Sequence, residues 1–198
     1  MELYGSLTSP YVRLCRVVAA MRGLDLPLVQ ANPYEDEGLR AVNPLGRVPA
    51  LRLDDGLALT DSGAIVRYLD ERGEGVSLYT RGGLARHETD AHVSLAMGVL
   101  DLGVAWFMEQ NKRADGERSA FWQQRRLDGA AAGLAAMDEA ARGLPEDAGL
   151  TGPAFAVTCD WLAFRMPQVD WRGHEALAAR VRAQLGEPAL AETDPRLA

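Results

Sequence analysis

The chain has 198 residues, 47% of them hydrophobic, and its formal net charge at pH 7 is −7. This length and composition support a full hydrophobic core in one large or two small domains, and they exclude global disorder. A negatively charged chain is repelled by a phosphate backbone, so we expect no nucleic-acid partner. We find no leader-like start and no run of about 20 apolar residues, and we therefore expect a cytoplasmic protein without a membrane segment.

The first third of the sequence alternates strand and helix patterns. We predict strands over residues 2–6, 26–31, 50–53 and 57–59, and helices over 10–23, 35–41 and 61–72. The first of these helices begins at Pro10 and ends at Gly23, residue types that are favoured at those two positions. The Asp-Asp-Gly sequence at 54–56 predicts the turn of a hairpin. This order, βαβ followed by ββα, predicts an α/β domain over residues 1–75.

A glycine-rich stretch ends this alternation, and we place an interdomain linker at residues 76–83. Beyond it we predict no strand, and helices over residues 84–111, 119–142, 154–166 and 174–185. An apolar and aromatic stretch between Met97 and Met108 is expected to serve mostly in helix packing, with a minority of its side chains lining an apolar pocket. The second domain, residues 84–198, is therefore expected to be all-helical.

Ser9 stands directly before Pro10, at the predicted start of a helix. Its simplest role is that of an N-cap. The same position also suits chemistry, because unpaired N–H groups and the helix dipole stabilise an anion there and lower the pKa of a thiol. Ser9 is thus a candidate donor to a ligand sulfur, and Thr8, Ser6 and Tyr4 are the alternatives.

Two further pairs of residues have both a structural and a functional interpretation. A proline at the start of a strand cannot donate to the ladder, and a cis bond between Val48 and Pro49 would leave the Val48 backbone able to bind an extended peptide. An ordinary turn is the simpler explanation.

Asp61 and Ser62 precede an apolar helical run and are good caps. As a site, Ser62 would bind a carboxylate and Asp61 an ammonium, which are the two charges of one amino-acid end.

Other signals point away from metal and dithiol chemistry. His87 and His92 are five residues apart, so a helix directs them to different sides. The position expected for a C-x-x-C pair, residues 9–12, holds no cysteine. Cys15 falls on the apolar face of its helix, and we expect it and Cys159 to be buried.

Three segments taken in order resemble the cytosolic glutathione transferase superfamily, in particular its bacterial, serine-type members. They are S-P-Y-V-R from Ser9, N-P-L-G-R-V-P-A-L from Asn43 and D-S-G-A-I-V-R-Y-L from Asp61. The likeness continues into the helical half, where the stretch around Asp160 resembles a buried helix start, with Val157 at the position of a hydroxyl cap. The resemblance implies a thioredoxin-like domain that binds glutathione and an all-helical domain that supplies the electrophile pocket.

The resemblance also assigns roles. Ser9 is implied to assist ionisation of the glutathione thiol, in place of the cysteine of thiol-exchange relatives. Val48, before a cis Pro49, is implied to pair through its backbone with the cysteinyl unit. Asp61 and Ser62 are implied to hold the γ-glutamyl end, and Arg47 lies at a basic position near the glycine carboxylate.

We therefore expect a homodimeric glutathione transferase that attacks a small apolar electrophile. The alternatives are a glutathione-dependent peroxidase or dehalogenase, a non-catalytic regulator or binding protein on the same fold, and a carrier of an apolar ligand. Maleylacetoacetate isomerisation is disfavoured, because the stretch S-x-x-S-C-S-x-R-V-R typical of that subgroup is absent. The resemblance further suggests that Arg13 lies near the site.

Overall fold

The chain divides into two compact units. The computed structural model describes residues 1–79 and 83–198. One unit comprises Met1–Tyr79 together with Glu187–Ala198, and the other comprises Thr80–Gly186. We expected residues 84–198 to form one domain, but the C-terminal segment clusters with the first unit instead. The division falls within the predicted linker 76–83, of which residues 80–82 lie outside the described residues.

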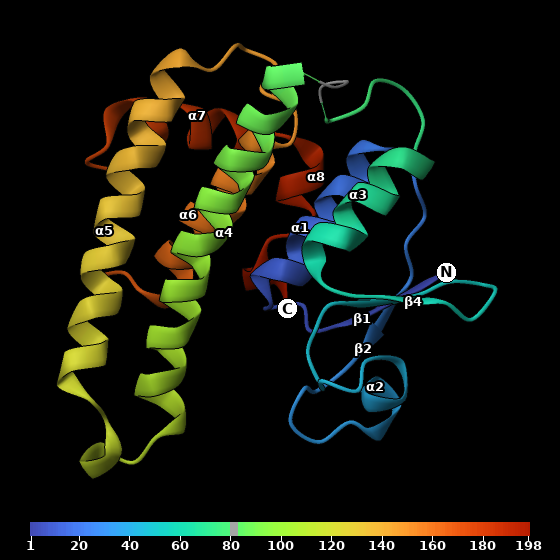
Figure 1. Ribbon diagram of the computed structural model, residues 1–198, viewed down its shortest axis with the longest axis horizontal. Coiled ribbons are helices and arrows are strands. Elements are labelled where there is room, and N and C mark those ends of the chain that lie inside the picture. The colour runs from blue at the N-terminus through green and yellow to red at the C-terminus, as the bar shows by residue number, and fades with distance from the viewer. Residues whose placement is uncertain (80–82) are drawn as a thin grey trace. The chain divides into compact units, whose positions relative to one another are not determined.

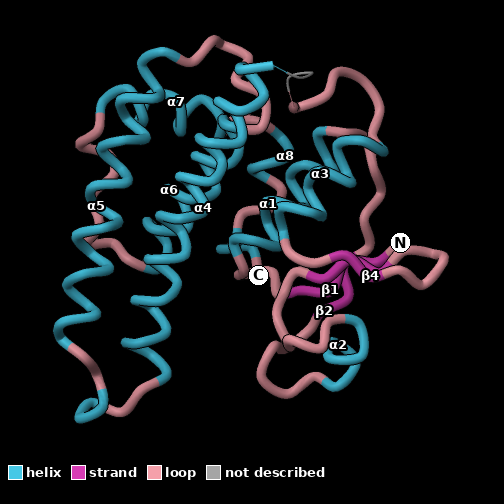
Figure 2. Tube along the Cα trace, viewed as in Figure 1, coloured by secondary structure: helices cyan, strands magenta, loops and turns pink. Residues whose placement is uncertain are grey.

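The first unit is built on a four-stranded sheet in the order β2-β1-β3-β4. Figures 1 and 2 show β1, β2 and β4 of this sheet. The strands are β1 (Glu2–Gly5), β2 (Leu28–Gln30), β3 (Ala50–Arg52) and β4 (Ala58–Leu59). β1 pairs in parallel with β2, and this parallel pair requires the helical crossover that separates them in sequence. β3 pairs antiparallel with both β1 and β4. The predicted βαβ–ββα order is confirmed.

Helices cover both faces of this sheet: α1 (Pro10–Met21), α2 (Glu37–Val42) and α3 (Ser62–Arg72). Side chains of a strand alternate between faces, so Gly5 and Tyr4 point in opposite directions. Gly5 faces α1, where a Cβ would lie 2.4 Å from a Val12 methyl. Tyr4 faces α2 and packs in a buried cluster with Ala31, Leu39 and Ala50. α1 packs against α3, so these two helices share one face.

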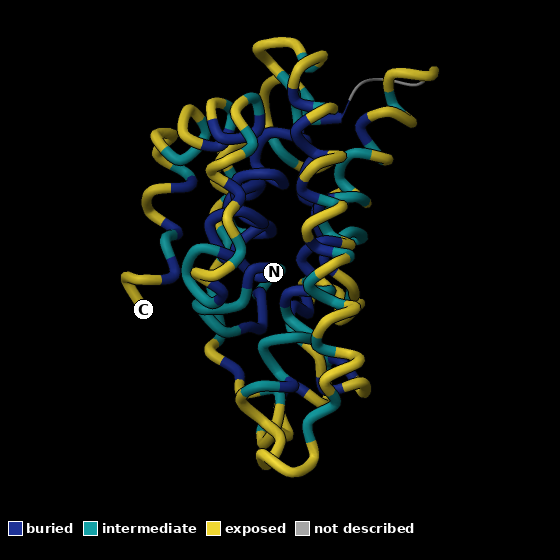
Figure 3. The backbone as a smooth tube through the Cα atoms, turned by 90° about the vertical axis from the view of Figure 1, so that its left-hand side faces the viewer, coloured by how far each residue is buried: buried dark blue, intermediate teal, exposed yellow. Residues whose placement is uncertain are grey.

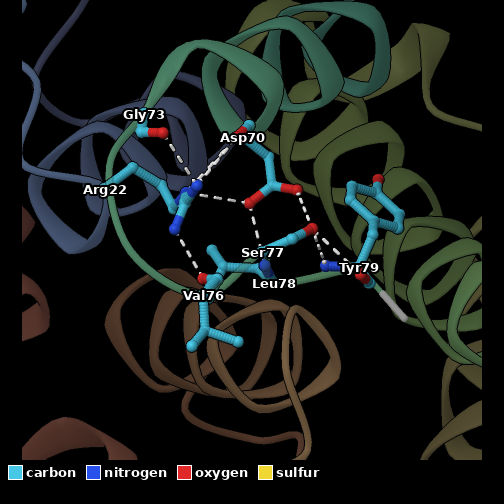
Figure 4. A network of polar contacts seen from close by, with 7 residues as sticks. All are labelled: Arg22, Asp70, Gly73, Val76, Ser77, Leu78 and Tyr79. Carbon is cyan, nitrogen blue, oxygen red and sulfur yellow. Dashed lines mark hydrogen bonds and ion pairs between the residues drawn. The ribbon is translucent and has the colours of Figure 1, made fainter. Parts of the chain in front are cut away.

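A buried ion pair ties the last turns of α1 and α3 to the segment that follows α3 (Figure 4). Arg22 Nε lies 3.0 Å from Asp70 Oδ1, and both residues are 4% exposed. The guanidinium also donates to the carbonyls of Asp70, Gly73 and Val76. The Asp70 carboxylate accepts from the Ser77 hydroxyl and from the Leu78 amide. The network therefore holds residues 73–78 against the helices of the first unit.

The C-terminal segment packs on α1 through α8 (Pro188–Ala191). Arg13, at 2% exposure, donates from Nη2 to the carbonyl of Leu190 at 3.0 Å and from Nε to the Thr193 hydroxyl at 3.4 Å. Arg13 thus anchors the end of the chain, and its backbone amide donates to the Ser9 carbonyl; the resemblance placed it near the ligand site, and that placement stays a prediction.

The second unit contains α4 (Gly83–Lys112), α5 (Ala120–Gly143), α6 (Thr151–Arg165) and α7 (Glu175–Leu185), so the all-helical prediction is confirmed. α6 is buried from Thr151 to Leu162. Our placement of its start was wrong. Val157 and Asp160 lie inside the helix, so the hydroxyl cap that we considered missing at Val157 is not required there.

One helix contradicts our expectation about apolar runs. Within α4 an 18-residue window has a mean hydropathy of 1.5, so this helix is long and apolar enough to cross a membrane. A single such helix is a weak sign of a span, because core helices of soluble proteins meet the same criterion. α4 packs on α5 and α6. Only 22% of the window is buried, and Figure 3 shows that exposed and buried positions alternate along the helices of the chain.

Candidate ligand-binding site

Strand register brings the candidate residues to one end of the sheet. Tyr4 of β1 pairs with Ala50 of β3, and the strands are antiparallel. Residues that follow Tyr4 therefore lie beside residues that precede Ala50. Leu59 of β4 pairs with Leu51 by the same rule. Residues 6–9, 47–49 and 60–62 therefore gather at this end, although 37 residues lie between the first and second segments and ten between the second and third.

Ser9 is the N-cap of α1, as its structural interpretation predicted. Its hydroxyl oxygen accepts from the Val12 amide at 3.4 Å, and its carbonyl accepts from the Arg13 amide at 2.9 Å. A hydroxyl that accepts here still carries a proton to donate. Among the described residues no acceptor takes that proton. The cap and the proposed donor are compatible in one side chain.

The alternative donors differ in their surroundings. Ser6 Oγ and Thr8 Oγ1 lie 3.2 Å apart and share one hydrogen bond. Tyr4 packs in the core on the face of the sheet that α2 covers. Ser9 is the residue of this set placed at the helix N-terminus, where the dipole favours an anion.

The Val48–Pro49 peptide bond is cis. Pro49 is buried and Val48 is half-buried. Within the described part of the chain neither the amide nor the carbonyl of Val48 takes part in a hydrogen bond. Both groups can therefore pair with an extended ligand, as an added strand would. Arg47, directly before Val48, has an exposed side chain.

Asp61 is the N-cap of α3, and its Oδ1 accepts from the Gly63 amide at 2.9 Å. The side chain is exposed, and a carboxylate offers further acceptor positions beyond that bond. Ser62 is 9% exposed, and its hydroxyl makes no hydrogen bond within the described residues. The Thr60–Asp61 bond is also cis, which the sequence did not signal.

The two cysteines are buried, as we expected. Burial is the main cause that raises the pKa of each thiol well above its ordinary value. Cys15 Sγ lies 4.0 Å from the Ser62 carbonyl, which brings α1 next to the start of α3. No group of three His, Cys, Asp or Glu side chains in residues 1–79 and 83–198 is placed to hold a metal ion.

Sequence reasoning did not assign a role to Asn43. Its side chain is 2% exposed and spans the loop before Val48, accepting from the Leu45 amide at 3.1 Å and donating to the Arg47 carbonyl at 2.8 Å. The signal that could have identified it is the motif N-P-x-G, in which Gly46 adopts a positive φ of 61°.

Comparison with known proteins bears on the family of this chain. Residues 3–77 match the family model of the glutathione S-transferase N-terminal domain. The chain is 31% identical over 115 residues to the uncharacterized GST-like protein YibF of Escherichia coli, covering 58% of this chain and 57% of that protein. It is 40% identical over 78 residues to maleylacetoacetate isomerase of Pseudomonas aeruginosa, covering 36% and 37% of the two chains. The matches thus span about half or less of these curated relatives.

Solved structures match over nearly the whole chain. A glutathione S-transferase from Methylobacillus flagellatus, with GSH bound, superposes with a TM-score of 0.93 at 32% identity over 98% of each chain. A glutathione transferase family member from Pseudomonas fluorescens, with bound glutathione, gives 0.92 at 33% identity over 98% of each chain. The fold is that of a thioredoxin-like unit, with the candidate site at one end of its sheet, followed by a helical unit. The chain belongs to the glutathione transferase superfamily.

Proposed function

We propose that this protein is a glutathione transferase that binds glutathione at the end of the sheet and activates its thiol through Ser9. The single observation that supports this best is the convergence of three segments with complementary groups. Ser9 offers a hydroxyl at the start of α1, Val48 offers an unpaired backbone before cis Pro49, and Asp61 with Ser62 offers an acid and a hydroxyl at the start of α3. The two solved relatives hold glutathione.

Each part of glutathione has a complementary group in this arrangement. The γ-glutamyl ammonium pairs with Asp61, and its carboxylate accepts from Ser62 and from the first N–H groups of α3, which have no partner within the helix. The cysteinyl backbone pairs with Val48. Arg47 is exposed one residue earlier and serves the glycine carboxylate.

The reaction that these groups support is attack by a thiolate. A cysteine thiol with an ordinary pKa near 8.5 is only about 3% ionised at pH 7. A hydrogen bond from Ser9 and the dipole of α1 stabilise the anion and lower this pKa. The thiol proton leaves to solvent, and the sulfur pair forms a bond to an electrophilic carbon. In a substitution the leaving group departs with its bonding pair, and in an addition a proton is taken up.

The proposal also includes the second unit and a second copy of the chain. The electrophile that the thiolate attacks is a small apolar molecule, and the helical unit supplies the apolar wall of its pocket. The protein acts as a homodimer in the cytoplasm. The larger apolar side chains of α4, such as Leu95, Val104 and Phe107, are half-buried in the single chain, so a second copy packed on this helix would cover them further.

Titration calorimetry with glutathione tests the proposal directly. We expect saturable binding by the unmodified protein and loss of at least tenfold in affinity in Asp61→Ala, because the ammonium loses its charged partner. Ser9→Ala should retain most of the affinity but raise the apparent pKa of the bound thiol. If folded protein shows no saturable heat with millimolar glutathione, the proposed function is wrong.

The alternatives make different predictions in the same titration. A non-catalytic regulator or a carrier of apolar ligands need not keep a glutathione site, so absence of binding would favour either of them. A peroxidase or dehalogenase would bind glutathione equally well, and turnover with a hydroperoxide or with an alkyl halide separates these from conjugation. The match to maleylacetoacetate isomerase covers 36% of this chain and 37% of that protein, so it does not carry that protein's activity over to this chain.

A further inference from the structure

The loop between α2 and β3 is organised around one buried amide side chain. Asn43 follows α2 directly and is 2% exposed. Its backbone amide donates to the Leu39 carbonyl at 2.7 Å, and its carbonyl accepts from the Gly46 amide at 2.8 Å. Its side chain adds the bonds to the Leu45 amide and the Arg47 carbonyl. Four hydrogen bonds of one residue therefore fix the course of residues 43–47.

The bond to the Arg47 carbonyl is the one that reaches the ligand site. This carbonyl belongs to the peptide unit whose N–H is the amide of Val48. Because that unit is planar, an oxygen held at 2.8 Å fixes the direction of the Val48 N–H on its opposite side. The next bond, Val48–Pro49, is cis, and Ala50 is already locked into β3. Asn43 thus fixes the orientation of the Arg47–Val48 peptide, which carries the Val48 N–H and which strand pairing in the sheet does not fix.

We infer that Asn43 is a positioning residue for glutathione: it aims the Val48 N–H at the cysteinyl carbonyl of the bound ligand. This inference depends on the proposed function, since it concerns how that same site holds glutathione. The side chain does not touch the ligand and acts only through the Arg47–Val48 peptide. It therefore contributes to binding and not to thiol ionisation, which belongs to Ser9 on another element.

The substitution Asn43→Asp replaces the side-chain NH2 group, which donates to the Arg47 carbonyl, with an oxygen and keeps the shape of the side chain. One carboxylate oxygen still accepts from the Leu45 amide, but the other now faces the Arg47 carbonyl, and two acceptors repel each other. The peptide must rotate away from its bonded orientation. We expect the Kd for glutathione to rise by about tenfold, which corresponds to loss of one well-placed hydrogen bond.

A matched control exists in the same unit. Asn32 also bonds a following amide, that of Tyr34 at 3.1 Å, and donates to Glu35 at 3.3 Å, but it lies exposed in a different loop. Asn32→Asp makes the identical chemical change and should leave the Kd unchanged. Asn43→Ser is a second variant at the site itself, in case a buried carboxylate prevents folding.

Calorimetry on the full chain gives the Kd together with the binding stoichiometry, so partly unfolded material lowers the stoichiometry without affecting the Kd. The apparent pKa of the bound thiol is followed by the ultraviolet absorbance of the thiolate. We expect both Asn43 variants to raise the Kd and leave that pKa unchanged, which is the reverse of the effect of Ser9→Ala.

The outcomes separate the two proposals. If the unmodified protein does not bind glutathione, the proposed function fails and this inference fails with it. If it binds and the Asn43 variants bind equally well, or Asn32→Asp weakens binding by the same factor, only the inference is overturned. A shift of the thiol pKa in Asn43→Ser equal to that in Ser9→Ala would also overturn it.

Discussion

The ion pair of Arg22 and Asp70 gives the sharpest stability prediction. The substitution Asp70→Asn keeps the size of the side chain but removes its charge. The Arg22 guanidinium then stays buried without a counter-ion, and the bonds to Ser77 and Leu78 lose a charged acceptor. The variant should therefore destabilise the first unit and release the segment that follows α3.

The magnitude depends on the groups that remain around Arg22. Breaking a buried ion pair by removing one partner costs about 3–5 kcal/mol. Here the carbonyls of Asp70, Gly73 and Val76 still accept from the guanidinium, so part of the charge stays compensated. We therefore expect the lower end, about 3 kcal/mol. For a chain of this length that loss lowers Tm by roughly 6–12 °C.

The distribution of tryptophans lets the assay report each unit separately. All four, Trp106, Trp122, Trp161 and Trp171, belong to the second unit. Urea unfolding followed by tryptophan fluorescence therefore reports the second unit, and far-ultraviolet circular dichroism reports both. The Asp70→Asn transition should shift in the circular dichroism trace, and hydrogen exchange of the Leu78 amide should accelerate.

Asp25→Asn is the control, because Asp25 is exposed in the same unit. It should change the free energy of unfolding by no more than about 0.5 kcal/mol. If Asp70→Asn lowers the free energy of unfolding by less than about 1 kcal/mol and leaves hydrogen exchange at the Leu78 amide unaltered, the argument that the Arg22–Asp70 pair stabilises this unit is refuted. It would mean that the three carbonyls alone stabilise the buried guanidinium.

Three further predictions concern single residues. Gly46 has a φ of 61°, and a Cβ there would lie 2.6 Å from Arg40 Nη1. Gly46→Ala should therefore lower the free energy of unfolding by about 1–2 kcal/mol. Urea unfolding followed by circular dichroism measures this loss, and an unchanged unfolding midpoint would contradict the prediction. The Leu177 amide donates to Asp138 at 2.9 Å, and this bond is the main cause that lowers the pKa of Asp138 in the folded protein. The Asp138 carboxylate therefore stabilises the fold fully above its unfolded pKa of about 3.9, and this stabilisation is lost as pH falls through the lower pKa of the folded state. The difference in fluorescence-detected stability between the unmodified protein and Asp138→Asn should thus shrink from pH 6 to pH 3, and a constant difference would count against the linkage. Cys15 should resist iodoacetamide in the folded protein and react only on unfolding, because burial raises the pKa of its thiol; stoichiometric labelling at pH 8 under native conditions would disprove this.

The sequence predicted elements well where one local signal decided them. The helix at α1 follows from Pro10 and an apolar repeat, and the β3–β4 hairpin from the turn at residues 54–56. It failed where the deciding contact is distant. α6 begins at Thr151, earlier than we predicted, and the C-terminal segment joins the first unit through Arg13. Arg22 is buried beside Asp70, and no local pattern in the sequence names a partner 48 positions away.

The sequence by itself determined the list of chemical groups: a hydroxyl at a helix start, a proline before a strand, and an acid followed by a serine. Local backbone preferences are enough to place each of these at the end of an element. Only the tertiary structure decided that Ser9 lies at the same end of one sheet as Val48 and Asp61, and that Asn43 holds the loop before Val48 in place. The reason is physical, because strand register joins Ser9 to Val48, 39 positions away, and no local pattern records which distant strand each one meets.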